Sequence, residues 1–396
     1  MSQYAARDPK GRRMEPKYVK RRQRGLAVII ATVVLLVGVV IYTGLQVSGA
    51  MGSKDYEGTG NGVAALVQVP EGSSVSALGP ELVDRGVVKS DSAFQAAAVN
   101  HPRAASIQPG FYRLQEHMSA KAAVDALLDP HNQVDLLDVT GGATLMDVTV
   151  VAGGTRKGIY TQISELSCDA GNSGHCVTVQ QLHDVAAKTP PTELGVPVWA
   201  VKAVLERGAD PKRLDGLIKP GQYVIDPTMD AKAILKDLIT RSTEYYNSTG
   251  IEQRAQAIGL SPYELLTAAS LVEREAPAGD FDKVARVILN RLAEPMRLEF
   301  DSTVNYGLSE QEVATTDGDR AKVTPWNTYA KDGLPATPIA APSDEAIQAM
   351  ENPAEGNWLF FVTIDKQGTT VFNDNFDAHQ QAVQDAMNSG VLDSNR

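Results

Sequence analysis

Two glutamates separated by a single residue, in Glu273-Arg274-Glu275, are the side chains of this sequence best placed for acid–base chemistry. They end a mostly apolar stretch, residues 261–276, whose spacing predicts a helix. An apolar setting and the negative end of the helix dipole both raise the pKa of a carboxyl group. Because Glu275 falls beside the apolar stripe, we expect it to be a general acid, with Glu273 as the alternative. Both could instead be solvated charges at a helix end.

The surrounding sequence predicts the helices and strands that must position these glutamates. Ser261-Pro-Tyr-Glu264 is a capping box with proline at the first helical position, and Pro277 ends the helix. Beyond it the pattern predicts a second helix, two strands and a closing helix, at residues 280–292, 358–363, 369–372 and 378–387.

Other kinds of catalytic centre lack their sequence signatures. The six histidines show no paired metal-ligand spacing, and neither a nucleophile elbow nor a phosphate-binding loop is present. We therefore expect no metal and no cofactor.

Five segments resemble the endolytic murein transglycosylase (YceG-like) family in order and separation. The resemblance implies that Glu275 is the catalytic glutamate and that Asp301, Tyr306, Asn327, Tyr329 and Asn373 line a glycan cleft. The segments are ASLVEREA (269–276), VILNRL (287–292), MRLEFDSTVNYG (296–307), WNTYAKDGLPATPIAAP (326–342) and FFVTIDKQGTTVFNDNFDAH (360–379).

The resemblance implies cleavage of MurNAc–GlcNAc bonds in nascent peptidoglycan strands, leaving anhydromuramyl ends and terminating elongation. One carboxyl group suffices for this reaction, because the attacking hydroxyl belongs to the sugar itself. The alternatives are a muramidase, in which Asp301 supplies the second carboxylate and water attacks, and a non-catalytic wall-binding adaptor that recruits the synthesis machinery.

The N-terminal charge pattern predicts a membrane anchor. Residues 1–24 contain nine Lys/Arg against Asp8 and Glu15, a net charge of +7, which leaves −18 on the rest of a chain whose total is −11. The twenty residues from Leu26 to Leu45 carry no charge and match the thickness of a bilayer as a helix. Positive residues stay in the cytoplasm, so the body is expected outside the cell membrane. A cleaved signal peptide is the competing interpretation, and the acidic body argues against nucleic-acid partners.

A repeat occupies the membrane-proximal part. Residues 107–128 and 218–239 are identical at nine of 22 aligned positions and predict a Pro-Gly turn, a short strand and a helix. We interpret them as duplicated α/β modules, one of them LysM-like by the family resemblance. The predicted fold is therefore α+β, and the expected parts are a basic tail, a transmembrane helix, a linker, these modules and a catalytic domain, at residues 1–24, 25–47, 48–62, 63–245 and 246–396.

The two cysteines, Cys168 and Cys176, flank a Gly- and Asn-containing stretch. Outside the cell, such a close pair favours a disulfide over two free thiols.

The charge pattern makes a prediction about topology. Protease added to intact spheroplasts should digest the body, because the +7 tail keeps the N-terminus inside. Full protection of the body until the membrane is broken would refute this orientation.

Overall fold

The computed structural model describes residues 55–150, 153–169, 176–226, 229–308, 310–311 and 315–391. The chain is a mixed α+β protein with several small sheets, and it divides between Val134 and Asp135 into two compact units. The predicted span at residues 25–47 lies outside the described residues. Among the helices that are described, none is long and apolar enough to cross a bilayer.

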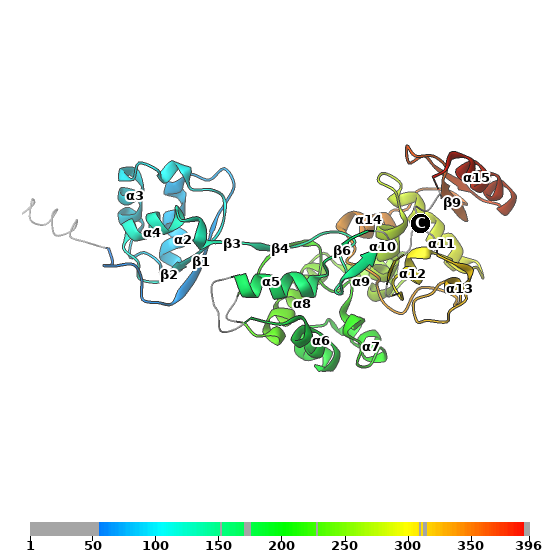
Figure 1. Ribbon diagram of the computed structural model, residues 1–396, viewed down its shortest axis with the longest axis horizontal. Coiled ribbons are helices and arrows are strands. Elements are labelled where there is room, and N and C mark those ends of the chain that lie inside the picture. The colour runs from blue at the N-terminus through cyan, green and yellow to red at the C-terminus, as the bar shows by residue number, and fades with distance from the viewer. Residues whose placement is uncertain are drawn as a thin grey trace, which may run out of the picture. The chain divides into compact units, whose positions relative to one another are not determined.

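The first unit is a small sheet covered by helices (Figure 1). Its strands pair antiparallel in the order β1-β2-β3. Apolar side chains from both layers, among them Val67, Phe94 and Leu114, are at most 1% exposed and form its core. The elements are β1 (Ala64–Val69), α2 (Gly79–Asp84), α3 (Asp91–Asn100), β2 (Gly110–Gln115), α4 (Ala120–Leu127) and β3 (Gln133–Val134).

The segment expected to be a flexible linker, residues 48–62, is bonded to this unit from Asp55 onward. The carboxylate of Asp55 accepts a hydrogen bond from the backbone N–H of Ala120, and Asn61 N–H donates to the carbonyl of Glu116, both at 2.9 Å. Gly60 has φ +123°, and a Cβ there would lie 2.5 Å from Gln115. Gly60 therefore allows a tight backbone path that a residue with a side chain could not follow.

The described residues in the first half of the second unit form four α-helices and strands of two small sheets. β4 pairs antiparallel with β7, while β5 pairs with β6 antiparallel and with β8 parallel. The elements are β4 (Leu136–Val139), β5 (Val148–Val150), β6 (Thr155–Arg156), α5 (Ile159–Asp169), α6 (Val179–Lys188), α7 (Val198–Glu206), β7 (Gly221–Val224) and α8 (Ala231–Ser248).

The remainder of the second unit is mostly helical and ends in a hairpin, β9–β10, with α15 packed against it (Figure 1). The elements are α9 (Ile251–Ala257), α10 (Pro262–Glu275), α11 (Phe281–Ala293), α12 (Asp301–Asn305), β8 (Glu310–Gln311), α13 (Asp317–Arg320), α14 (Asp344–Glu351), β9 (Phe360–Thr363), β10 (Thr370–Asn373) and α15 (Phe376–Ser389).

The compact units do not follow the boundary expected at residue 245. One continuous apolar core runs from Leu137 to Met350. Tyr246 at the end of α8 and Ile251 at the start of α9 are both buried in it. The second repeat and the glutamate-bearing helix α10 therefore share one core, because helices on both sides of residue 245 bury their apolar faces together.

The two repeats have the same local structure. In each, a strand pairs antiparallel with an earlier strand across intervening helices and is followed by a helix capped by Ser119 or Asp230. The hydroxyl of Tyr112 donates to the carbonyl of Gln108 at 2.8 Å. Its counterpart Tyr223 donates to the carbonyl of Lys219 at 2.7 Å. The shared Pro-Gly-x-Tyr residues thus build the same strand entry twice.

The structure joins Cys168, near the end of α5, to Cys176, just before α6, with Cα atoms 4.6 Å apart. Closing so short a loop stabilises a fold by about 2–3 kcal/mol, mainly by restricting the unfolded chain.

This pairing leads to an experimental expectation. In protein isolated from cells, neither thiol should react with an alkylating reagent until a reductant is added. Replacing both cysteines by serine should lower the free energy of unfolding by about 2–3 kcal/mol. Quantitative labelling without reductant would show that the pair is not bonded in the cell.

Candidate active site

Helix α10 carries the glutamate pair out of the core. Its capping box forms as the sequence predicts, with the Ser261 hydroxyl accepting from the N–H of Glu264 and the Glu264 carboxylate accepting from the N–H of Ser261. Residues 265–272 are all buried, and only the last turn reaches partial exposure. Ala276 leaves the helix in an extended conformation, so the carboxyl groups lie where the buried helix ends.

Glu273 is held by the start of another helix. One carboxylate oxygen, Oε2, accepts from the backbone N–H of Ser343 at 2.9 Å and from its hydroxyl at 2.5 Å. Ser343 is the N-cap of α14, where a negative charge is favourable. Gly141 also approaches closely, since a Cβ there would lie 2.4 Å from Glu273 Oε1. These contacts indicate that Glu273 fixes the position of α10.

Glu275 has a different environment. Its Oε1 accepts a hydrogen bond from the backbone N–H of Ser302 at 3.1 Å. Burial raises the pKa of this carboxyl group above its usual range, although hydrogen bonding from Ser302 opposes the change, and the negative charge of Asp301 raises it further. Glu275 is thus poised to hold and release a proton, as a general acid must.

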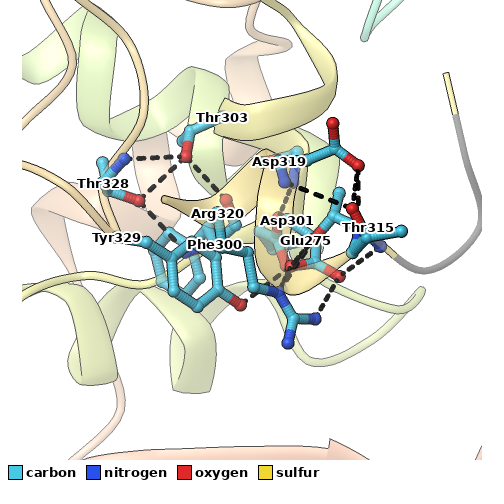
Figure 2. Close-up of polar contacts among 11 residues, drawn as sticks. Glu275, Phe300, Asp301, Thr303, Thr315, Asp319, Arg320, Thr328 and Tyr329 are labelled. Carbon is cyan, nitrogen blue, oxygen red and sulfur yellow. Dashed lines mark hydrogen bonds and ion pairs between the residues drawn. The ribbon is translucent and has the colours of Figure 1, made fainter. Parts of the chain in front are cut away.

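Asp301, the first residue of α12, is surrounded by donors (Figure 2). Its Oδ1 accepts from the hydroxyls of Thr315 at 2.7 Å and Tyr329 at 2.8 Å. The guanidinium of Arg320 binds both oxygens, at 3.2 and 3.0 Å. Burial acts to raise the pKa of Asp301, but these hydrogen bonds outweigh it and lower the pKa. Asp301 is therefore a fixed negative charge.

The environments of the two carboxyl groups push their pKa values in opposite directions. The pKa of Glu275 is raised and the pKa of Asp301 is lowered. Such a separation of pKa values distinguishes a proton donor from an anion in an active site. The oxygens of Asp301 are already occupied by Arg320, Thr315 and Tyr329, which leaves it poorly suited to activate water.

The loop that carries Tyr329 is fixed from within. Asn327 is 1% exposed; its amide donates to the carbonyls of Arg320 and Lys322, and its Oδ1 accepts from the N–H of Tyr329. Asn327 thus positions Tyr329 and Arg320, whose side chains reach Asp301. The family resemblance places Asn327 in the glycan cleft, whereas the contacts describe a residue that shapes the cleft wall.

Tyr306 and Asn373 do not join this network. Tyr306 is 5% exposed, and its hydroxyl donates to Asp215 Oδ2 at 2.5 Å. Asn373 ends β10 opposite Phe360, and its buried Nδ2 has no hydrogen-bond partner among the described residues. The five residues suggested by the resemblance therefore divide: Asp301, Tyr329 and Asn327 form one cluster, while the other two lie in separate settings.

Several residues of the site have no distinctive sequence signal. Arg320 and Thr315 lie in a polar stretch without periodicity. Ser343 precedes a short helix, a position where serine is common and therefore not a distinctive signal. Thr303 and Thr328 are fully buried, with their hydroxyls 2.9 Å apart, and they join α12 to the Tyr329 loop. Among the described residues, no group of three or more His, Cys, Asp or Glu side chains could hold a metal ion.

Comparison with known proteins now gives the family. The sequence profile of the YceG-like family matches residues 67–385. This chain belongs to the YceG-like family. A solved structure of a YceG-like protein from Listeria monocytogenes shares the fold, with a TM-score of 0.50 at 23% identity over 80% of this chain and 98% of that one.

Two relatives of this YceG-like protein carry the name endolytic murein transglycosylase. The relative from Bacillus subtilis (strain 168) is 28% identical over 327 residues, which are 82% of this chain and 85% of the relative. The relative from Streptococcus pneumoniae (strain ATCC BAA-255 / R6) is 27% identical over 343 residues, which are 82% of this chain but 58% of the longer relative.

The buried pair of Tyr306 and Asp215 makes a prediction about stability. Burial raises the pKa of Asp215 to about 7, against the hydrogen bonds from Tyr306 and from the N–H of Leu145. A raised pKa means that the folded state binds the proton more tightly than the unfolded state. The stability that this proton contributes is therefore complete below about pH 4 and is lost as the pH rises through 7.

We expect Asp215→Asn to remove this loss. Between pH 5 and pH 8 the wild type should lose about 2.5 kcal/mol more of its free energy of unfolding than the variant does, because about two pH units separate pH 5 from the folded pKa of Asp215. Urea unfolding of both proteins at the two pH values measures the difference. An identical pH dependence in the two proteins would mean that Asp215 is ionised in the fold throughout this range.

Proposed function

We propose that this YceG-like protein is a lytic transglycosylase that cleaves MurNAc–GlcNAc bonds in peptidoglycan glycan strands, with Glu275 as its catalytic residue. The observation that supports this most directly is the half-buried carboxyl group of Glu275, whose pKa is raised, next to an aspartate whose oxygens are all engaged. The names of the relatives from Bacillus and Streptococcus support the same activity.

In the proposed reaction Glu275 acts twice. Its proton passes to the oxygen that leaves with GlcNAc, while the bond from that oxygen to the muramyl C1 breaks and positive charge develops on the sugar. The resulting carboxylate then takes the proton of the muramyl C6 hydroxyl, whose oxygen bonds to C1 and closes the anhydro ring. Glu275 regains its proton, and no water is consumed.

The muramidase alternative requires a second carboxylate that activates water or attacks the sugar. Asp301 is the candidate nearest to Glu275, and its charge contributes to the raised pKa of Glu275. Because its oxygens accept from Thr315, Tyr329 and Arg320, its role in the proposal is electrostatic: it keeps Glu275 protonated and favours the positive charge of the transition state.

The position of the protein in the cell follows from the predicted anchor. Residues 48–54 alone would separate the span from the bonded residue Asp55, and seven residues cover at most about 25 Å. The body would then stay close to the outer face of the cell membrane, where glycan strands are polymerised. Each of the two modules of repeated structure, one of them LysM-like by the family resemblance, is proposed to hold a glycan strand away from its ends. We therefore propose internal cleavage of nascent strands, which terminates elongation beside the synthesis machinery.

Mass analysis of the fragments released from purified glycan strands tests the reaction. Fragments of several disaccharides with anhydromuramyl ends are expected. Reducing muramyl ends would establish hydrolysis instead. Release of mainly single disaccharides would show cleavage from strand ends and contradict internal action. A protein that binds strands without any cleavage would be an adaptor.

The neighbouring glutamates provide a matched pair of variants. Glu275→Gln should lower the rate of strand cleavage by at least about two orders of magnitude, because the amide cannot donate and retrieve the proton. Glu273→Gln should retain most of the activity, since its remaining amide oxygen can still accept from Ser343. Circular dichroism and thermal unfolding check that both variants are folded. A greater loss of activity in Glu273→Gln than in Glu275→Gln would mean that the proposal names the wrong carboxyl group.

A further inference from the structure

Two arginines lie close to one face of the small β6-β5-β8 sheet, beside the proposed catalytic glutamate. Arg156 on β6 is directly opposite Val148 on β5, and Gln311 on β8 is paired with Val150. Side chains alternate along a strand, so Val148 and Val150 share a face, and Arg156 and Gln311 share it with them. Arg274 reaches this face from α10, with its Nη2 3.5 Å from the amide oxygen of Gln311.

The same stretch of chain receives both Arg274 and Glu275. Glu275 accepts from Ser302 at the start of α12, and Arg274 contacts Gln311 a few residues further on. Arg274, and with it the sheet face that carries Arg156, therefore lies against the same chain segment that contacts Glu275.

Neither guanidinium has a carboxylate partner within 4 Å in the described part of the chain. The acids nearest in sequence to Arg274 are engaged elsewhere, Glu273 with Ser343 and Glu275 with Ser302. Glu310, the acid beside Gln311, lies on the opposite face of the sheet.

The two positive charges disfavour each other. Arg274 is half-buried; burial and then the charge of Arg156 lower its pKa, while the charges of Glu275 and Glu273 oppose this change. A half-buried guanidinium that lacks an ion-pair partner within 4 Å and lies near a second, exposed guanidinium is a favourable place for an anion to bind. Arginine forks match the planar geometry of a carboxylate and bind it through two parallel hydrogen bonds.

We propose that Arg156 and Arg274 form a carboxylate-binding subsite that takes an acidic group carried by the lactyl–peptide arm of the muramic residue. This inference rests on the proposed function. In a peptidoglycan strand the sugar that closes the anhydro ring is the one that carries this arm. A carboxylate on the arm anchors the muramyl unit beside Glu275 and selects it over GlcNAc, which has no acidic group.

Arg156→Gln in the full-length protein tests the subsite, because Arg156 is exposed, at a strand end, and outside the hydrogen-bond networks of Glu275 and Asp301. The matched control is Lys157→Gln, which removes the same charge one residue further on. Lys157 pairs with Glu165 at 2.7 Å. Both variants and the wild type are assayed on strands that carry peptides, on strands stripped to the free lactyl carboxylate, and on stripped strands whose carboxylate is converted to a neutral methylamide.

On strands that carry carboxylates, Arg156→Gln should raise KM by about five- to tenfold with little change in kcat, since a charge-assisted hydrogen bond to the substrate is lost. Added salt should raise the KM of the wild type more than that of the variant. The difference between the two proteins should disappear on the neutral strands, and Lys157→Gln should match the wild type throughout. If KM rises only on peptide-bearing strands, the carboxylate that the subsite binds belongs to the peptide. If KM rises equally on stripped strands, the carboxylate belongs to the lactyl group.

Two outcomes overturn the subsite while leaving the proposed function intact. One is a KM for Arg156→Gln equal to that of the wild type on carboxylate-bearing strands. The other is the same rise in KM on all three substrates, which would mean that Arg156 shapes the cleft without binding an anion. Failure of the wild type to cleave any of the strands would instead refute the proposed function.

Discussion

The arrangement of the site depends on holding one carboxyl group at the point where a buried helix leaves the core. Residues 265–272 of α10 are all buried, so the helix can neither rotate nor slide without losing apolar contacts. At its end Glu273 is fixed by Ser343 and the N-terminus of α14, and this contact sets the direction of Glu275 two residues later. The position of the Glu275 side chain is therefore a consequence of packing and of one half-buried, hydrogen-bonded carboxylate, that of Glu273.

Charge then gives the two carboxyl groups different properties. Glu275 receives a single backbone hydrogen bond and stays partly desolvated, whereas Asp301 receives hydrogen bonds from Thr315, Tyr329 and Arg320. The pKa of the first group is raised and that of the second is lowered, and the charge of the second contributes to the rise. Such a pair suits a reaction in which one group moves the proton and the substrate supplies its own nucleophile.

Much of this could be predicted from local patterns. The capping box at Ser261, the helix stop after Glu275, the hairpin near residue 365 and the strand–helix repeats all form as the spacing indicates. Two further features of the fold are not apparent from composition. The glycine-rich segment after Asp55 is bonded to the first unit, and the core continues across residue 245, because backbone pairing and apolar burial join segments that composition alone separates.

The sequence by itself determined the helix that carries the glutamates and the family, and it predicts Glu275 rather than Glu273 as the acid, because these depend on residues within a few turns of one another or on motifs in a fixed order. Only the tertiary structure decided which distant side chains surround them. Arg320 reaches Asp301 from 19 positions away, Ser343 reaches Glu273 from 70, and Arg274 reaches the sheet face that carries Arg156. No local periodicity encodes such contacts, since they arise when separate apolar faces pack into one core and bring polar side chains together at its edge.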